Sequence, residues 1–272
     1  MEQHNPKQDR EQHAVEERLS LIRRVLLVLS GKGGVGKSTV AVNIAVALAG
    51  EGKEVGLLDI DIHGPSIPRM LGLEGEPILS HGSAILPVEF TPNLKVMSMG
   101  FFLKGRDDAV IWRGPMKYGV IRQFLGDVEW GELDYLVVDS PPGTGDEPLN
   151  IAQMVGKRVS AVIVTTPQRV SIDDVRKSID FCRKVEIPVA GIVENMSGFI
   201  CPHCGGTVDI FENGGGKRLA DEAEVPFLGS IPLDPQVVRS GDEGRPLVLG
   251  QRDSAVSQAF REVIAHVVSS VE

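Results

Sequence analysis

Short apolar runs alternate along this chain with longer segments in which apolar residues recur at helical spacing. The apolar runs predict strands at residues 25–29, 55–60, 135–139, 160–166, 189–195 and 226–231. Helical patterns lie at residues 37–50, 115–127, 147–155, 169–185, 214–223 and 253–268. Strands and helices that alternate in this way are typical of βα units. The pattern therefore predicts an α/β fold built on a mainly parallel, doubly wound sheet.

Two parts of the chain depart from this alternation. Residues 83–99 contain two prolines and predict a hairpin rather than a helix. Residues 1–24 are polar and charged, so we expect a mobile arm or a short helix outside the core. The remaining residues, 25–272, are expected to form one domain.

Composition and charge narrow the classes of function. The chain has 272 residues, of which 42% are hydrophobic and 24% charged, as in a globular protein with a sizeable core. Three cysteines and a polar start without a signal peptide predict a location in the reducing cytoplasm. A formal charge of -9 argues against nucleic acid as the main partner. The last helical pattern has few basic residues, which argues against a helix lying on a membrane.

The segment SGKGGVGKST, residues 30–39, follows the first predicted strand directly and opens a helix. It matches G-x-x-x-x-G-K-[ST] in the context that this phosphate-binding motif requires, so a chance glycine-rich turn is disfavoured. Lys37 is expected to span the β- and γ-phosphates of a nucleotide, and Ser38 to coordinate Mg²⁺. The expected nucleotide contacts are Gly31, Lys32, Gly33, Gly34, Val35, Gly36, Lys37, Ser38 and Thr39.

Acidic residues follow two further predicted strands. Asp59 and Asp61 occur in LLDIDIHGPSIP, and Asp139 and Asp146 in YLVVDSPPGTGDEP. Ligands of doubly wound sheets bind at the carboxyl ends of the strands, so we expect these acids to meet at the γ-phosphate. Asp139 fits an acid that holds Mg²⁺, although each acid alone could be an ordinary strand-end cap. The Pro- and Gly-rich loop after it is typical of a switch that senses the γ-phosphate.

Cys201 and Cys204 lie two residues apart in FICPHCGG. Two thiolates at this spacing can bind a metal, but a tetrahedral thiolate site needs four ligands. A structural zinc, a dithiol redox site and a pair of unliganded cysteines are the alternatives. The redox site is disfavoured because Gly-Gly is a poor helix start. His203 is expected to point outward, and Cys182, on an apolar helix face, to be a core residue.

The motif KGGVGKS, with its second lysine, resembles the deviant Walker A class of ATPases. In that class the extra lysine reaches the nucleotide of the facing subunit, which the resemblance implies for Lys32; a solvated lysine is the alternative. By the same resemblance Asp59 assists with the metal and Asp61 orients the attacking water. It also suggests Asn195 and the backbone near Pro232 as adenine contacts, although Asn195 could equally be a turn residue.

A larger set of segments between Val25 and Leu249 resembles the Mrp-type iron–sulfur cluster carrier ATPases. It includes DIDIHGPSIPRMLG, VIWRGPMK, IVENMSGFICPHCG and PFLGSIPLDP. The resemblance implies an ATP-hydrolysing homodimer that holds a [4Fe-4S] cluster between its subunits and transfers it to apo iron–sulfur proteins. Cys201 and Cys204 of each subunit would then supply four thiolates. The cluster-binding loop would be an insertion at about residues 196–212.

Other readings of the chain stay open at this point. A positioning or partitioning ATPase, with a structural zinc at the two cysteines, would share the nucleotide site but need a membrane or DNA surface; we expect neither partner. A small-molecule kinase has no identifiable acceptor pocket. Some carrier relatives have an N-terminal cysteine motif or accessory domain. Residues 1–24 contain no cysteine, so we expect no stable second cluster.

Overall fold

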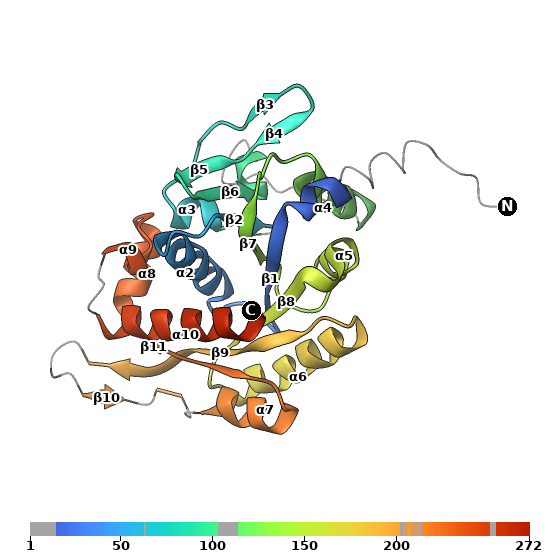
Figure 1. Cartoon of the computed structure of the whole chain (residues 1–272). Helices are drawn as coiled ribbons and strands as arrows, with labels where there is room; N and C mark the ends of the chain where they lie inside the picture. The colour runs from blue at the N-terminus through green and yellow to red at the C-terminus, as the bar shows by residue number, and fades with distance from the viewer. Residues whose placement is uncertain are drawn as a thin grey trace.

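One twisted sheet runs through the protein, with helices on both of its faces (Figure 1). The computed structural model describes residues 15–62, 64–102, 114–201, 204, 206–208, 210–211, 214–250 and 254–272. In these residues the strand order is β10-β9-β8-β1-β7-β2-β6-β5, and β11 pairs with β9. The bounds are β1 Ile22–Ser30, β2 Val55–Asp59, β5 Val88–Thr91, β6 Leu94–Ser98, β7 Leu133–Asp139, β8 Val159–Thr165, β9 Val189–Ile200, β10 Thr207–Val208 and β11 Phe227–Leu233.

Most neighbouring strands are parallel. β1 pairs in parallel with β7 and β8, β2 with β6 and β7, and β9 with β8 and β11. The antiparallel pairs are β5 with β6 and β10 with β9. The predicted doubly wound, mainly parallel α/β fold is therefore confirmed.

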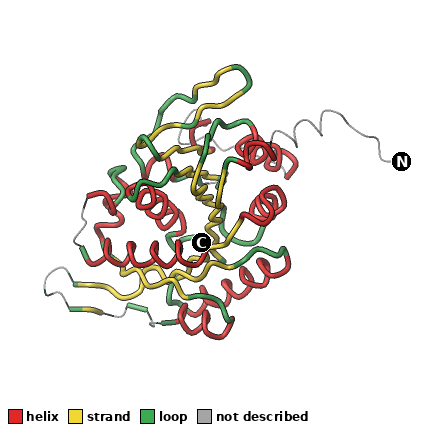
Figure 2. Tube along the Cα trace, in the orientation of Figure 1, coloured by secondary structure: helices red, strands yellow, loops and turns green. Residues whose placement is uncertain are grey.

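Helices cover the two faces of the sheet (Figure 2). α2 (Lys37–Gly50) and α10 (Ala255–Val271) pack on one face, and α4 (Gly114–Gly126), α5 (Asp146–Val155), α6 (Arg169–Lys184) and α7 (Gly215–Ala223) on the other. Shorter helices are α3 (Ile67–Met70), α8 (Pro235–Asp242) and α9 (Leu247–Gly250), with 3₁₀ turns η1 (Met99–Phe102) and η2 (Gly156–Arg158). α3 and α9 contact α2, and α8 contacts α3 and α9.

The sequence of β1 shows why the sheet needs cover on both faces. Leu27 and Leu29 pack in the core on the side of α5 and α6, whereas Leu26 and Val28 pack in the core on the side of α2 and α10. A strand without an alternating polar face can be buried only between two layers. α2 packs on this sheet with small and branched apolar residues, and most positions around the helix are buried.

The predicted strands and longer helices are present, with shifted ends. Residues 83–99 form an antiparallel pair at β5 and β6 as predicted, but β6 also joins β2 in parallel. The start of that range, β4 (Ala84–Leu86), pairs instead with β3 (Leu79–His81). α3, α8 and α9 were not predicted, because four to eight residues hold too few turns for a periodic pattern.

The expectation that residues 1–24 lie outside the core is wrong from residue 15 onward. Residues 15–20 are helical, and β1 already begins at Ile22. Val15, Leu19 and Ile22 are buried among core residues because each places an apolar side chain against the sheet. Residues 1–14 lie outside the described residues.

None of the helices in the described part of the chain has both the length and the apolar character that crossing a bilayer requires.

Candidate functional site

The predicted phosphate loop connects β1 to α2 at the carboxyl end of the sheet. Gly34 and Gly36 both have φ 80°, a left-handed conformation that favours glycine. α2 begins at Lys37, and its N-cap residue, Gly36, has no side chain to cap the helix. The N–H groups of the first turn of a helix are suited to binding a phosphate. A cavity of about 270 Å³ lies over the loop. Its walls include most of the predicted contacts: Lys32, Gly33, Gly34, Gly36, Lys37, Ser38 and Thr39.

The two remaining predicted contacts do not line this cavity. A Cβ added to Gly31 would lie 2.5 Å from Asp174 of α6, so this glycine allows the loop to pass close to the helix. Val35 is buried, and its carbonyl accepts a hydrogen bond of 2.9 Å from Nδ2 of Asn195. Both residues shape the loop from outside the cavity.

Three buried groups converge behind the loop at the ends of neighbouring strands. Asp59 and Asp139 are register partners in β2 and β7, and Asp59 also faces Ser98 in β6. Lys37 forms a buried ion pair with Oδ1 of Asp139. Asp59 accepts hydrogen bonds from the backbone N–H of Asp61 at 3.0 Å and from Oγ of Ser98 at 2.9 Å. Two of the four acids, Asp59 and Asp139, therefore lie together at the ends of neighbouring strands.

Burial makes this acidic pair electrostatically costly. Desolvation, followed by repulsion from Asp139, raises the pKa of Asp59 to about 8. Desolvation also raises the pKa of Asp139, although Lys37 opposes this shift. Among the described residues, Oδ2 of Asp139 is a buried side-chain oxygen without a hydrogen-bond partner. A pair of carboxylates with an unused oxygen, next to the Ser38 hydroxyl, fits a hard divalent cation such as Mg²⁺.

The other acids and the Pro- and Gly-rich loop lie closer to the surface. Asp61 lines the cavity, and its Oδ1 accepts from the backbone N–H of Gly64 at 3.3 Å. Asp146 is exposed at the start of α5 and is not among the residues that line the cavity. The backbone N–H of Gly143 donates to the carbonyl of Ser30 at 2.8 Å, which ties the loop to the start of the phosphate motif.

Lys32 lies at the rim of the cavity. Its Nζ donates to Oε1 of Gln168 at 3.3 Å, and Gln168 is the N-cap residue of α6. Lys32 as a residue is half-buried, so it is not a fully solvated lysine in this chain.

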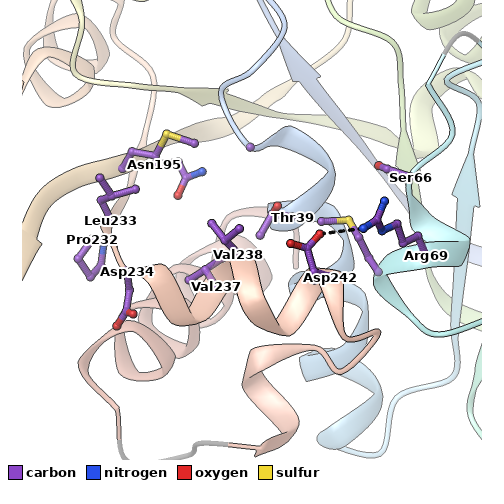
Figure 3. Close-up of a pocket in the computed structure, with 14 residues that line it drawn as sticks. Thr39, Ser66, Arg69, Asn195, Pro232, Leu233, Asp234, Val237, Val238 and Asp242 are labelled. Atoms are coloured by element: carbon purple, nitrogen blue, oxygen red, sulfur yellow. Dashed lines mark hydrogen bonds and ion pairs between the residues drawn. The ribbon is translucent and has the colours of Figure 1, made fainter. Parts of the chain in front are cut away.

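A second pocket of about 310 Å³ adjoins the phosphate cavity (Figure 3). The two share Gly36, Thr39, Ser66 and Met70. Asn195 and Pro232, both expected from the sequence, lie on its wall, as do Met196, Leu233, Val237 and Val238. A largely apolar pocket that continues from a phosphate cradle has the chemistry to hold a nucleoside.

The sequence did not predict that α8 forms part of the wall of this second pocket. Val237 and Val238 project from this helix into the pocket (Figure 3). Its start carries a recognisable signal, because Oδ1 of Asp234 accepts from the backbone N–H of Gln236 at 2.8 Å and Pro235 occupies the first helical position.

β9 and β10 form a hairpin that projects beside the main body (Figure 1). Cys201 directly follows β9, and Cys204 lies between the two strands in the sequence. β9 continues to Ile200, past the expected strand end, and pairs with β10. The backbone N–H of Cys201 donates to the carbonyl of Gly206 at 2.9 Å, which narrows the turn. Cys204 is exposed and Cys201 half-buried, and no disulfide joins them. His203 lies outside the described residues.

The described residues of one chain place no group of three or more His, Cys, Asp or Glu side chains in a metal-binding arrangement. Cys182 is fully buried in α6, as expected, and burial raises the pKa of its thiol to about 12. A thiol in that state is a core residue and not a ligand.

A family model described as "ParA: NUBPL iron-transfer P-loop NTPase" matches residues 21–268. A protein of Methanocaldococcus jannaschii named "Iron-sulfur cluster carrier protein" is 50% identical over 258 residues, covering 95% of this chain and 88% of the relative. A protein of Trichoplax adhaerens named "Cytosolic Fe-S cluster assembly factor NUBP2 homolog" is 51% identical over 253 residues, covering 92% and 96% of the two chains.

Solved structures show the same likeness. A nucleotide-binding protein of Archaeoglobus fulgidus in complex with ADP is 42% identical, with a TM-score of 0.76 over 86% of this chain and 91% of that chain. The cell division ATPase MinD of Pyrococcus furiosus has a TM-score of 0.66 over 91% and 99% of the two chains. At 24% identity, MinD supports the fold alone.

Proposed function

This chain belongs to the NUBPL iron-transfer P-loop NTPase family, and from that premise we propose that it binds and hydrolyses ATP and carries an iron–sulfur cluster to apo-proteins. ATP is the substrate and the cluster is the cargo. One observation carries the proposal: β9 contributes Asn195 to the wall of the nucleotide pocket and ends one residue before Cys201. A single strand therefore joins the nucleotide site to a pair of accessible thiols.

ATP hydrolysis at this site depends on positioning and on neutralised charge. The γ- and β-phosphates take the place of Asp139 as partners of Lys37, while N–H groups of the loop and of the first turn of α2 bind the remaining oxygens. Asp61 orients the attacking water. Ser38, Asp59 and Asp139 would hold Mg²⁺, which when bound supplies positive charge next to the phosphates.

The nucleoside occupies the pocket between Asn195 and α8. The ribose and adenine lie against Pro232, Leu233, Val237 and Val238, whose apolar surface excludes water. Asn195 holds the Val35 carbonyl and so fixes the loop that meets the phosphates. The proposed roles of Asn195 and Pro232 are therefore different: the first positions the loop and the second contacts the base.

The cluster is shared by two copies of the chain. A cubane cluster needs four thiolates, and the cysteine hairpin offers Cys201 and Cys204. In a two-fold dimer the same patch from both subunits meets at the axis and completes the set. Lys32, held by Gln168 within one chain, would turn to the nucleotide of the facing subunit in this dimer. The thiols require a reducing compartment, which the cytoplasm provides.

Anaerobic purification and reconstitution test the proposal. Iron, sulfide and zinc are measured per chain, an absorption spectrum is recorded, and the loaded protein is mixed with an apo-protein that needs a [4Fe-4S] cluster. We expect about four iron and four sulfide per two chains, and activation of the acceptor. Zinc that iron and sulfide fail to replace would instead establish a structural metal site.

A further inference from the structure

Glu194 is a fully buried carboxylate that the nucleotide and cluster sites do not use. It lies in β9, with Thr165 of β8 and Ser230 of β11 as register partners. Its Oε1 accepts from Oγ of Ser197 at 2.7 Å and from the backbone N–H of Gly214 at 3.3 Å. Its Oε2 accepts from the backbone N–H of Gly216. These donors offset the cost of burying the charge.

The groups that Glu194 binds stand at both ends of the cysteine segment, residues 195–213. Ser197 lies just after the strand enters this segment, and Gly214 is the N-cap residue of α7, where the segment ends. Gly214 has no side chain to cap the helix, so the carboxylate of Glu194 takes that place. The side chain of Glu194 therefore forms hydrogen bonds at both ends of the cysteine segment.

The two residues that follow Glu194 contact the nucleotide site. Nδ2 of Asn195 donates to the carbonyl of Val35 in the phosphate loop. Met196 lines the adjoining pocket and has φ 58°, a conformation that a side chain of its kind rarely adopts. Met196 therefore carries backbone strain between Asn195, which holds the phosphate loop, and Ser197, which binds Glu194. A movement of the phosphate loop would act on this strained residue.

We propose that Glu194 is the positioning residue of the cysteine segment, and that it passes the nucleotide state of the phosphate loop to Cys201 and Cys204. Nucleotide binding shifts Val35, the hydrogen bond to Asn195 moves β9, and the carboxylate carries α7 and the far end of the segment along. The positioning role rests on this geometry; only its purpose, the control of a carried cluster, rests on the proposed function.

The substitution Glu194→Gln distinguishes the positioning of the cysteine segment from a simple capping of α7. Its amide keeps the size of the side chain, but its NH₂ faces a backbone N–H where the carboxylate had an acceptor oxygen. A residue that only capped α7 would change the stability of the chain. It would not change how strongly a nucleotide alters the reactivity of a cysteine.

The test uses the full chain, reduced and free of iron and zinc, with Cys201→Ser so that Cys204 is the exposed thiol. The rate of Cys204 alkylation by iodoacetamide is measured with and without saturating Mg-ADP, after ADP affinity has been determined for each variant. Glu194→Gln is compared with Glu222→Gln, which removes an exposed carboxylate from the far end of α7. A second variant, Ser197→Ala, removes one donor and keeps the helix cap, should Glu194→Gln fail to fold.

We expect ADP to change the alkylation rate about fivefold or more in the parent and in Glu222→Gln, the lower end of usual coupling between sites. The ratio of the alkylation rates with and without ADP should approach one in Glu194→Gln. In Ser197→Ala it should lie between one and the parent value. A parent-like ratio in both variants, or a parent ratio of one, overturns the positioning role. Iron uptake by the wild-type chain is scored separately. If the ratio falls to about one only in Glu194→Gln and the wild-type chain takes up no iron, the carrier function alone is refuted.

Discussion

Asp59 and Asp139 lie opposite each other in the parallel ladder of β2 and β7, both without solvent exposure, and share one neighbouring cation, Lys37. Lys37 pairs with Asp139 and leaves Asp59 with neutral donors only. Burial of the carboxyl group, followed by repulsion from Asp139, raises the pKa of Asp59 to about 8. Below about pH 8 Asp59 is therefore largely protonated, and a divalent cation that binds both carboxylates has to displace that proton.

Asp59→Asn should stabilise the nucleotide-free chain at pH 8. Because the pKa of Asp59 is about 8 in the folded chain and 3.8 when unperturbed, the folded state binds more protons between these values. Stability therefore falls as the pH rises from 3.8 to about 8. Removing the carboxylate should recover about 1–3 kcal/mol at pH 8 and little near pH 4.

Urea unfolding without Mg²⁺, at both pH values, measures this difference. Asp242→Asn, at an exposed carboxylate, is the control and should change neither value. ATP hydrolysis by Asp59→Asn should fall even as its stability rises, since a site built for function carries unfavourable charge. Equal stability of mutant and wild type at pH 8 would contradict the raised pKa.

Lys37→Ala should lose most nucleotide affinity and also destabilise the chain. The mutation removes the main charge partner of the phosphates and leaves Asp139 buried and unpaired, at a cost of about 3–5 kcal/mol. Adding Asp139→Asn should restore stability without restoring binding. Lys177→Ala, at an exposed lysine, is the control. Labelled ATP at equilibrium and thermal unfolding are the measurements; wild-type affinity in Lys37→Ala would refute the phosphate-loop assignment.

The phosphate loop and the strand-end acids could be predicted because each depends on a few adjacent residues. Ser30–Thr39 contains its own strand end, turn and helix start, and Asp59 and Asp139 follow directly from apolar runs. The rule that parallel strands present their carboxyl ends together then brings distant residues to one place. Local pattern and topology were sufficient for this part of the site.

The rest depends on contacts that no local pattern encodes. Glu194 binds Gly214 and Gly216, which lie 20 and 22 residues further along, and the sequence gives no sign of that pairing. Leu19 belongs to a polar stretch, yet its side chain is buried because the helix that carries it packs on the sheet. β9 could not be followed beyond residue 195, because its continuation, residues 196–200, is only half-buried and its end pairs with the short strand β10.

Gly36→Ala should destabilise the nucleotide-free chain more than Gly34→Ala does. Both glycines have φ 80°, so both substitutions introduce the same backbone strain, about 1–2 kcal/mol. Only at Gly36 would the new Cβ collide with Nδ2 of Asn195; at Gly34 there is nothing within 4 Å. Thermal unfolding gives the loss of stability in each variant. The additional loss in Gly36→Ala measures the contact between the phosphate loop and Asn195 of β9. Equal losses would show that Asn195 moves aside without cost.

Lys32→Ala should retain nucleotide binding but lose hydrolysis if Lys32 completes the facing active site. Gln168→Ala is the matched control, because it removes the partner of Lys32 and keeps the charge; its hydrolysis should be retained. Mixing Lys32→Ala with Asp61→Ala chains tests the role across subunits, since one site of the mixed dimer is then intact. No recovered activity, while both chains bind ATP and dimerise, would contradict it.

Cys201→Ala and Cys204→Ala should each abolish stable cluster loading and transfer. Both thiols stand at the end of the β9–β10 hairpin, and a shared cubane leaves no spare ligand when either is lost. Cys182→Ala is the control, because that thiol is buried in α6 and its raised pKa keeps it protonated. ATP binding should persist in all three variants, since no cysteine is among the described residues that line the two nucleotide cavities.

The number of iron atoms per chain decides whether the cluster is shared. One cubane between two chains gives about two iron and two sulfide per chain, and the cluster then links the subunits. Its loss should weaken dimers in the absence of nucleotide, because a ligand bound only by the dimer stabilises the dimer. Light scattering on anaerobically reconstituted protein, with metal analysis of the same sample, gives mass and content together. Four iron on a monomer would refute the shared cluster, because one chain would then have to supply ligands beyond Cys201 and Cys204.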